Sequence, residues 1–254
     1  MKIFLCGQRS FGKEVCRALL DAGHEIVGVA PAPPQKHQDK LYGYAAVKGL
    51  PLVTDCKSLV SSAIPSGTEL IVAAHSHWLI SGQCLERAKF GGIGFHPSLL
   101  PRHRGKDAVR WAVHMGDYVS GGTVYRLTDK TDGGDILRQE LVWIKPGWTY
   151  HDLWRAIFPI GVRLLVDAVQ DLERGGGLWA EQDESCATWE PSWDRPRLER
   201  RELLALGGEA PAVSESDTPK ECMGCIRDCA WCTYNIADPE TCLLYTSPSP
   251  RDTR

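Results

Sequence analysis

The chain has 254 residues, of which 43% are hydrophobic and 24% are charged, and its formal net charge is −3. This is the composition of a soluble globular protein, and no apolar run approaches the ~18 residues that a membrane-spanning helix needs. The weak negative charge excludes bulk attraction to a nucleic-acid backbone. The apolar start "KIFLC" is too short for a secretory signal, so we expect a cytoplasmic protein with no membrane partner, and the charge disfavours nucleic acid as a partner.

The first hundred residues alternate between predicted strands and predicted helices. Strands are predicted at 2–6, 24–30, 50–53, 69–74 and 91–95, and helices at 12–23, 40–49 and 81–90. Several of these strands are apolar throughout, which is typical of parallel strands buried on both faces. The order therefore predicts an α/β fold with a mostly parallel sheet and helices on both faces.

The pattern changes after Pro101. A helix is predicted at 107–116, and residues 121–129 and 135–144 then alternate with period two, which predicts an antiparallel pair of strands. The longest helical pattern covers 150–176, with a kink expected at Pro159. This helix closes a predicted catalytic domain of residues 1–180.

Residues 181–254 are predicted to be a linker and a cysteine-rich tail, largely irregular or non-native. Cys222, Cys225, Cys229 and Cys232 form two CxxC pairs, but the gap between the pairs is far shorter than the ~12–20 residues of usual zinc-binding ribbons. A compact metal site and a cysteine-rich segment of no function both remain open. We assign no metal ligand.

Gly7, Gly12 and Lys13 reproduce most of a phosphate-binding loop after the first predicted strand. Glu14 stands where such a loop has a magnesium-binding serine or threonine, and its carboxylate would repel phosphate. We interpret the glycines as a turn into the first helix, so a nucleotide site is not expected.

His96 is placed at the carboxyl end of the strand "GGIGF", where open α/β sheets hold their ligands. Pro97 restricts the backbone of His96, and Pro101 stiffens the loop that follows. Asp132 and Gly133 lie in a polar turn between the two later strands. Taken alone this is an ordinary solvated turn, but an imidazole and a carboxylate brought together suit acyl transfer.

The stretch "HPSLLPRHRG" (96–105), followed by "DGGDIL" (132–137), resembles the formyltransferase family, whose members use 10-formyltetrahydrofolate. The resemblance covers roughly residues 1–180. It implies a Rossmann-like parallel sheet, 10-formyltetrahydrofolate as formyl donor, and catalytic roles for His96 and Asp132.

The resemblance also implies binding residues. The segment "SHWLIS" (76–81) is similar to the family stretch that lines the pterin pocket. The implied folate contacts are Ser76, His77, Trp78, Leu79, Ile80, Thr131 and Gly133. Arg102 and Arg104 are the implied substrate contacts. Leu79 and Ile80 as helix core, and the arginines as a solvated loop, are the alternatives.

One departure from the family pattern bears on the reaction. Transferases of the family usually have an asparagine two residues before the histidine, whereas this chain has Gly94. The surrounding motif looks most like the hydrolase domain of 10-formyltetrahydrofolate dehydrogenase. We therefore expect formyl transfer to an amine, similar to methionyl-tRNA formyltransferase, with hydrolysis and folate binding without turnover as alternatives.

The acceptor is not specified by the sequence. Residues 182–204 resemble a linker to the tRNA-binding domain of the family, but the remaining tail is short and acidic, so tRNA is not supported as a partner. The oligomeric state also stays open.

Overall fold

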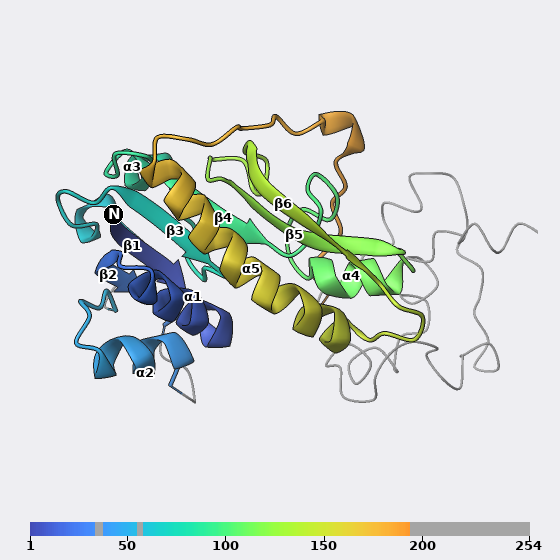
Figure 1. Cartoon of the computed structure of the whole chain (residues 1–254), viewed down its shortest axis with the longest axis horizontal. Coiled ribbons are helices and arrows are strands. Elements are labelled where there is room, and N and C mark those ends of the chain that lie inside the picture. Colours follow the sequence, from blue (N-terminus) through green and yellow to red (C-terminus); the bar gives the residue numbers. More distant parts are fainter. Residues whose placement is uncertain (34–37, 55–57, 194–254) are drawn as a thin grey trace, which may run out of the picture.

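The computed structural model describes residues 1–33, 38–54 and 58–193. Within them, six strands form one sheet in the order β2-β1-β3-β4-β5-β6 (Figure 1). The strands are β1 (Lys2–Gly7), β2 (Glu25–Ala30), β3 (Leu70–Ala74), β4 (Gly92–His96), β5 (Val119–Arg126) and β6 (Ile136–Trp143). The helices are α1 (Arg9–Asp21), α2 (Lys40–Val47), α3 (Gly82–Leu85), α4 (Ala108–His114) and α5 (Tyr150–Glu173), with 3-10 helices η1 (Ser61–Ala63) and η2 (Glu184–Cys186).

The sheet has a parallel part and an antiparallel part. β1 pairs in parallel with β2 and with β3, and β3 pairs in parallel with β4. β5 pairs antiparallel with β4 on one side and with β6 on the other. The predicted α/β class and the predicted antiparallel pair are both confirmed.

Two predicted elements differ from the structure. The expected strand at 50–53 is reduced to an isolated bridge between Leu52 and Val29, because Pro51 has no N–H to donate to a ladder. The expected helix at 81–90 ends at Leu85 as α3. Beyond it, the backbone N–H of Phe90 donates to the Glu69 carbonyl, so this segment pairs with the chain entering β3 instead of continuing the helix.

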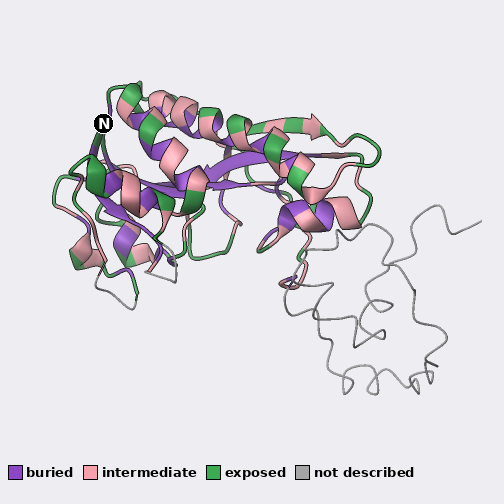
Figure 2. Cartoon of the chain, turned by 90° about the horizontal axis from the view of Figure 1, so that it is seen from below, coloured by how far each residue is buried: buried purple, intermediate pink, exposed green. Residues whose placement is uncertain are grey.

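The two faces of the sheet carry separate parts of the core. Ile3, Leu5 and Ile93 pack with α1, α2, α4 and α5 on one face. Phe4 and Ile71 pack on the other face with the segment around η1 and α3. Helices therefore cover both faces as predicted, and the second face has the shorter ones. The sheet lies buried between the two layers in Figure 2.

α5 is the long helix that crosses the sheet in Figure 1. It begins at a capping box in which Thr149 and Asp152 exchange hydrogen bonds, and it continues through Pro159. Farther along, Gly161 meets Phe95 of β4, where an added Cβ would lie 2.5 Å from Cζ of the phenylalanine ring. The glycine thus lets α5 approach the strand that ends at His96.

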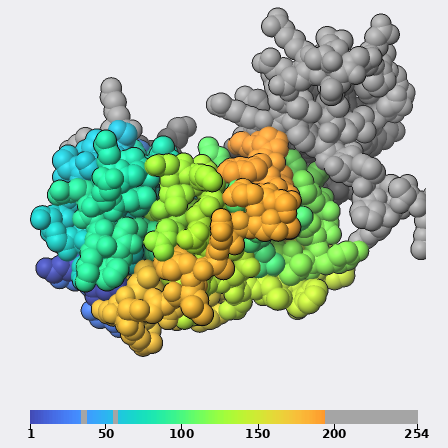
Figure 3. All heavy atoms as spheres, turned by 90° about the horizontal axis from the view of Figure 1, so that it is seen from above, coloured from blue at the N-terminus to red at the C-terminus, as the bar shows by residue number. Residues whose placement is uncertain are grey.

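The segment after α5 runs back across the molecule and is drawn in orange in Figure 3, over residues coloured green. Ala180 forms a bridge with Ile136, and Trp189 forms one with Arg104. Residues 181–193 are irregular except for η2. We call them the C-terminal strap. Cys222, Cys225, Cys229 and Cys232 lie outside the described residues.

None of the helices in the described part of the chain is long and apolar enough to cross a membrane. The same residues contain no group of three or more metal-ligating side chains.

Candidate functional site

Strained backbone marks the loops around one end of the sheet. Within the described residues, five that are not glycine have positive φ: Arg9, His75, His103, Asp107 and Asp132. They follow β1, β3 and β4 or lie in the β5–β6 turn. Left-handed conformations cost energy outside glycine and gather at functional sites, so these loops contain the candidate site.

His96 and Asp132 are brought together as the sequence predicts. His96 is the last residue of β4, and the β5–β6 turn folds back so that Asp132 Oδ2 lies 3.4 Å from His96 Nδ1. On the other side of the ring, His96 Nε2 donates to the His103 carbonyl at 2.6 Å. A carbonyl oxygen only accepts hydrogen bonds, so Nε2 of His96 carries a hydrogen. Without a second proton, the lone pair of Nδ1 would face the carboxylate of Asp132, so attraction between the two side chains needs a proton between them.

The carboxylate of Asp132 is held by two donors. The Gly105 N–H donates to Oδ2 at 2.7 Å, and the Tyr125 hydroxyl donates to Oδ1 at 2.6 Å. Asp132 has a φ of 50°, a left-handed conformation that aspartate tolerates better than most residues. Its orientation toward His96 is therefore set by the loop after β4 and by β5.

Tyr125, which donates to Asp132, is buried, with 7% of its surface exposed. Burial, and then the charge and hydrogen bond of Asp132, raise the pKa of Tyr125 well above 10. The phenol therefore keeps its proton at neutral pH and acts as a donor to Asp132.

His103 joins the site to the C-terminal strap. Its Nε2 lies 2.7 Å from Asp117 Oδ2, and its Nδ1 lies 3.0 Å from Glu190 Oε1. Burial alone would lower the pKa of His103, but the two carboxylates outweigh it and raise the pKa to about 9. The imidazolium is therefore charged at neutral pH while its own carbonyl orients His96.

Gln182 of the strap joins the two loops that carry His96 and Asp132. Its Nε2 donates to the carbonyls of Asp132 and Gly134, at 2.8 and 2.6 Å. Its Oε1 accepts two hydrogen bonds from the guanidinium of Arg104. Gln182 is 5% exposed, so these bonds lie away from solvent.

The predicted folate stretch lies directly after β3, and its side chains divide between core and surface. Trp78 and Ile80 are buried in the core beside α3, and Trp78 Nε1 donates to the Pro31 carbonyl. Ser76 Oγ bonds to the backbone of Trp78. His77 is exposed, and Leu79 is 83% exposed. Leu79 and Ile80 are the two residues whose alternative role is the core side of a helix. Only Ile80 is a core residue, and neither of them lies in a helix.

The predicted substrate arginines have partners within the chain. Arg102 Nη2 lies 3.3 Å from Asp117, and Arg104 is 3% exposed and pairs with Glu184. Binding a substrate through either guanidinium would have to displace these carboxylates. In the β5–β6 turn, Thr131 is exposed and Gly133 is half-buried. Their roles in ligand binding stay predictions.

Sequence reasoning missed Tyr125, Gln182 and Glu190. Tyr125 could have been found by pairing the strands, since it lies opposite Gly94 in the β4–β5 register. Gln182 and Glu190 gave no local signal, because they act from a segment predicted to be irregular. Their partners are far away in the sequence.

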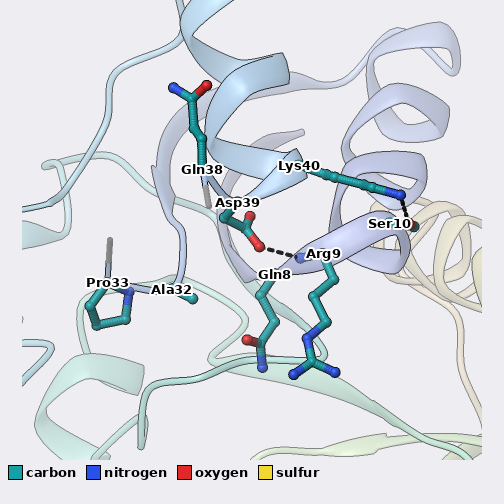
Figure 4. A pocket seen from close by; sticks show the side chains of 8 residues that line it. All are labelled: Gln8, Arg9, Ser10, Ala32, Pro33, Gln38, Asp39 and Lys40. Carbon is teal, nitrogen blue, oxygen red and sulfur yellow. Dashed lines mark hydrogen bonds between the residues drawn. The ribbon is translucent and has the colours of Figure 1, made fainter. Parts of the chain in front are cut away.

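A separate cavity of about 300 Å³ lies beside the start of α1 (Figure 4). Its lining consists of Gln8, Arg9, Ser10, Ala32, Pro33, Gln38, Asp39 and Lys40. Asp39 accepts from the Arg9 N–H, and Lys40 donates to Ser10. Within α1, Lys13 Nζ lies 3.4 Å from Glu14 Oε1.

The fold and the site together define an α/β protein with an imidazole–carboxylate pair suited to acyl-group transfer. Comparison with known families agrees, since residues 54–169 match the formyl transferase family. That match includes β3, β4, His96, the β5–β6 turn and Asp132. Residues 54–169 thus match a formyl transferase domain, in agreement with the resemblance found in the sequence.

Curated relatives bear names of two kinds. The cytosolic 10-formyltetrahydrofolate dehydrogenase of Xenopus laevis is 35% identical over 233 residues, a match that covers 84% of this chain and 26% of the relative. The methionyl-tRNA formyltransferase of Acidobacterium capsulatum is 30% identical, over 75% of this chain and 65% of the relative. The chain spans about a quarter of the length of the dehydrogenases that it matches.

Solved structures agree on the fold. Glycinamide ribonucleotide transformylase 1 from Symbiobacterium toebii has a TM-score of 0.59 and 23% identity, over 72% of this chain and 95% of that one. The N-formyltransferase from Helicobacter canadensis, in complex with folinic acid and dTDP-3-aminofucose, has a TM-score of 0.63 and 16% identity, over 78% and 75% of the two chains. At these identities the similarity shows the shared fold alone.

Proposed function

We propose that this chain moves the formyl group of 10-formyltetrahydrofolate to an amine. The observation that carries the proposal is the 3.4 Å approach of His96 Nδ1 and Asp132 Oδ2 inside the matched family stretch. The side chains of the two residues are 7% and 11% exposed, so a formyl group placed beside the pair would be shielded from most water.

His96 and Asp132 have different roles in the proposed reaction. When the amine nitrogen bonds to the formyl carbon, negative charge develops on the formyl oxygen, and the Nδ1–H of a protonated His96 stabilises it. The amine loses a proton to Asp132 as this bond forms, and Asp132 passes a proton to N10 of tetrahydrofolate as the old bond breaks. The His103 carbonyl keeps the ring of His96 in the required orientation.

The folate contacts are proposed on the stretch 76–80 together with Thr131 and Gly133. Because Trp78 and Ile80 are core residues, we expect the pterin to meet the backbone of this stretch and the exposed side chain of Leu79. A cytoplasmic location stays a prediction.

Hydrolysis is the second candidate, with water as acceptor and formate as product. It is favoured by Gly94, because no side chain projects from this position toward the formyl oxygen. It is also favoured by the dehydrogenase relative from Xenopus laevis, which matches 84% of this chain, against 75% for the methionyl-tRNA formyltransferase relative.

The test follows the release of tetrahydrofolate from 10-formyltetrahydrofolate, with water alone and with glycinamide ribonucleotide, an aminosugar nucleotide or methionyl-tRNA added. We expect release that depends on one amine. His96→Ala and Asp132→Ala should each lower kcat by at least about a hundredfold. Matched controls on α5, His151→Ala and Asp167→Ala, should keep the wild-type rate.

Release without any amine, lost in both site variants, would establish the hydrolase instead. Saturable folate binding without release under any condition would contradict both enzymatic proposals and leave a folate-binding protein.

A further inference from the structure

We propose that Tyr125 is a positioning residue of the formyl-transfer site, holding Asp132 through its hydroxyl while its ring fills the space beside Gly94. The inference rests on the proposed function of His96 and Asp132. It adds a residue that acts through Asp132 and explains why position 94 has no side chain.

The space beside Gly94 is already occupied. Gly94 lies directly opposite Tyr125 in the β4–β5 register, two residues before His96 and on the same face of β4. A Cβ added at Gly94 would lie 3.2 Å from Cε1 and Cζ of the Tyr125 ring and 2.8 Å from Cδ2 of Leu127. A side chain at 94 would therefore collide with Leu127 and press against the ring of Tyr125.

The hydroxyl of Tyr125 is committed to the carboxylate. It donates its single proton to Asp132 Oδ1 at 2.6 Å, so it has no second hydrogen to give to a formyl oxygen. The opposite oxygen, Oδ2, accepts from the Gly105 N–H and faces His96. Tyr125 thus fixes which carboxylate oxygen meets the imidazole, and it acts on the reaction through Asp132.

Burial strengthens this hydrogen bond. The tyrosine is 7% exposed, so water does not replace the donor when the hydroxyl is removed. The carboxylate would then keep one fixed donor and gain freedom to rotate away from His96.

The first test is Tyr125→Phe, which keeps the ring against Gly94 and removes the hydroxyl. We expect kcat to fall about ten- to a hundredfold, as for loss of a hydrogen bond to a charged group. KM for 10-formyltetrahydrofolate should stay near the wild-type value. The melting temperature should fall by no more than the loss of one buried hydrogen bond explains, and kcat is compared at a temperature where both chains are folded. Tyr118→Phe, at an exposed tyrosine just before β5, is the matched control and should keep the wild-type kcat.

A double-mutant cycle tests whether the effect passes through Asp132. In an Asp132→Ala background, the further change Tyr125→Phe should alter the residual rate by less than about twofold, because the hydrogen-bond acceptor is already lost. Full, multiplicative effects of the two substitutions would overturn the proposal.

A measurement independent of activity uses ζ-13C-labelled tyrosine at neutral pH. The resonance missing from Tyr125→Phe belongs to Tyr125, and Asp132→Ala, which removes the acceptor oxygen, should shift it. Asp129→Ala, in the same turn, should leave it in place. A Tyr125 resonance that does not shift in Asp132→Ala would overturn the hydrogen bond itself.

The role of the space beside Gly94 is tested by Gly94→Ala against Gly92→Ala. Both added methyl groups crowd Leu127, but only the one at 94 reaches the Tyr125 ring. We expect Gly94→Ala alone to shift the Tyr125 resonance and to lower kcat by more than Gly92→Ala does. Equal effects on both readouts would overturn the packing part of the proposal.

The failure of each proposal has its own signature. Turnover that requires His96 but is unchanged in Tyr125→Phe overturns the role of Tyr125 alone. The absence of turnover in the wild-type chain overturns the proposed function and this role together.

Discussion

At His103, two carboxylates from distant parts of the chain hold an imidazole that burial by itself would keep neutral. Asp117 comes from the turn before β5 and lies against Nε2 of the ring. Glu190 comes from the C-terminal strap and lies against Nδ1. The pKa of Asp117 is lowered because His103 outweighs the effect of its burial. The imidazolium of His103 thus connects the C-terminal strap, through an ion pair, to the loop that orients His96.

The ion pairs of His103 predict that the free energy of unfolding depends on pH. The pKa of His103 is raised from 6.5 to about 9 in the folded chain, so its contribution is complete below pH 6.5 and is lost as pH rises toward 9. We expect the free energy of unfolding to fall by roughly 3 kcal/mol over this window. Urea unfolding at pH 6.5 and 9.5 measures it.

His103→Gln should remove that pH dependence, whereas His77→Gln, at an exposed histidine, should retain it. A fall of the same size in His103→Gln and in the wild-type chain would contradict the assignment to this residue.

At the scale of elements, α5 and β4 pack closely enough to constrain the site. Gly161 of α5 contacts the ring of Phe95, the residue before His96. Gly122 of β5 faces the same ring, with an added Cβ 2.6 Å from Cε2. Small residues on a helix and on a strand thus make room for one aromatic side chain, which fixes the end of β4.

We therefore expect Gly161→Ala to lower the free energy of unfolding by about 1–3 kcal/mol, because the new methyl group overlaps the Phe95 ring. Gly43→Ala is the matched control, since Gly43 also lies inside a helix but has its nearest neighbour atom at 3.7 Å. It should be neutral or stabilise by up to about 1 kcal/mol. Denaturant unfolding compares them, and equal effects would contradict the packing argument.

At the scale of the whole molecule, the strap closes the site from the far end of the described chain. Gln182 contacts both site loops, and Glu190 pairs with His103. The Trp111 indole donates to the Pro191 carbonyl, and the Trp193 N–H donates to Asp107. From these contacts we propose that the functional unit extends past residue 180, the boundary that the sequence predicts.

This predicts a difference between two truncated chains, one ending after residue 180 and one ending after residue 193. The shorter chain should have a lower melting temperature and at least about tenfold lower kcat, because residues 182–193 no longer hold the His96 and Asp132 loops. Equal melting temperatures and rates would show that residue 180 is the true boundary.

The sequence by itself determined the order of the strands along the chain, the α/β class and the pairing of His96 with Asp132. Apolar runs and turn residues are local signals, and the two site motifs are long enough to be recognised. The sequence overestimated the strand at 50–53 and the helix at 81–90. In both segments the backbone hydrogen bonds to neighbouring parts of the chain decide how far the element extends.

Only the tertiary structure decided which side chains surround the pair. Tyr125 lies opposite Gly94 because β4 and β5 are antiparallel and in one register, and it reaches Asp132 because the β5–β6 turn folds back toward it. Gln182 and Glu190 reach the loops because the strap turns back over them. Such contacts join residues that share no local pattern. Their geometry depends on how separate elements pack, which a single sequence does not encode in any one segment.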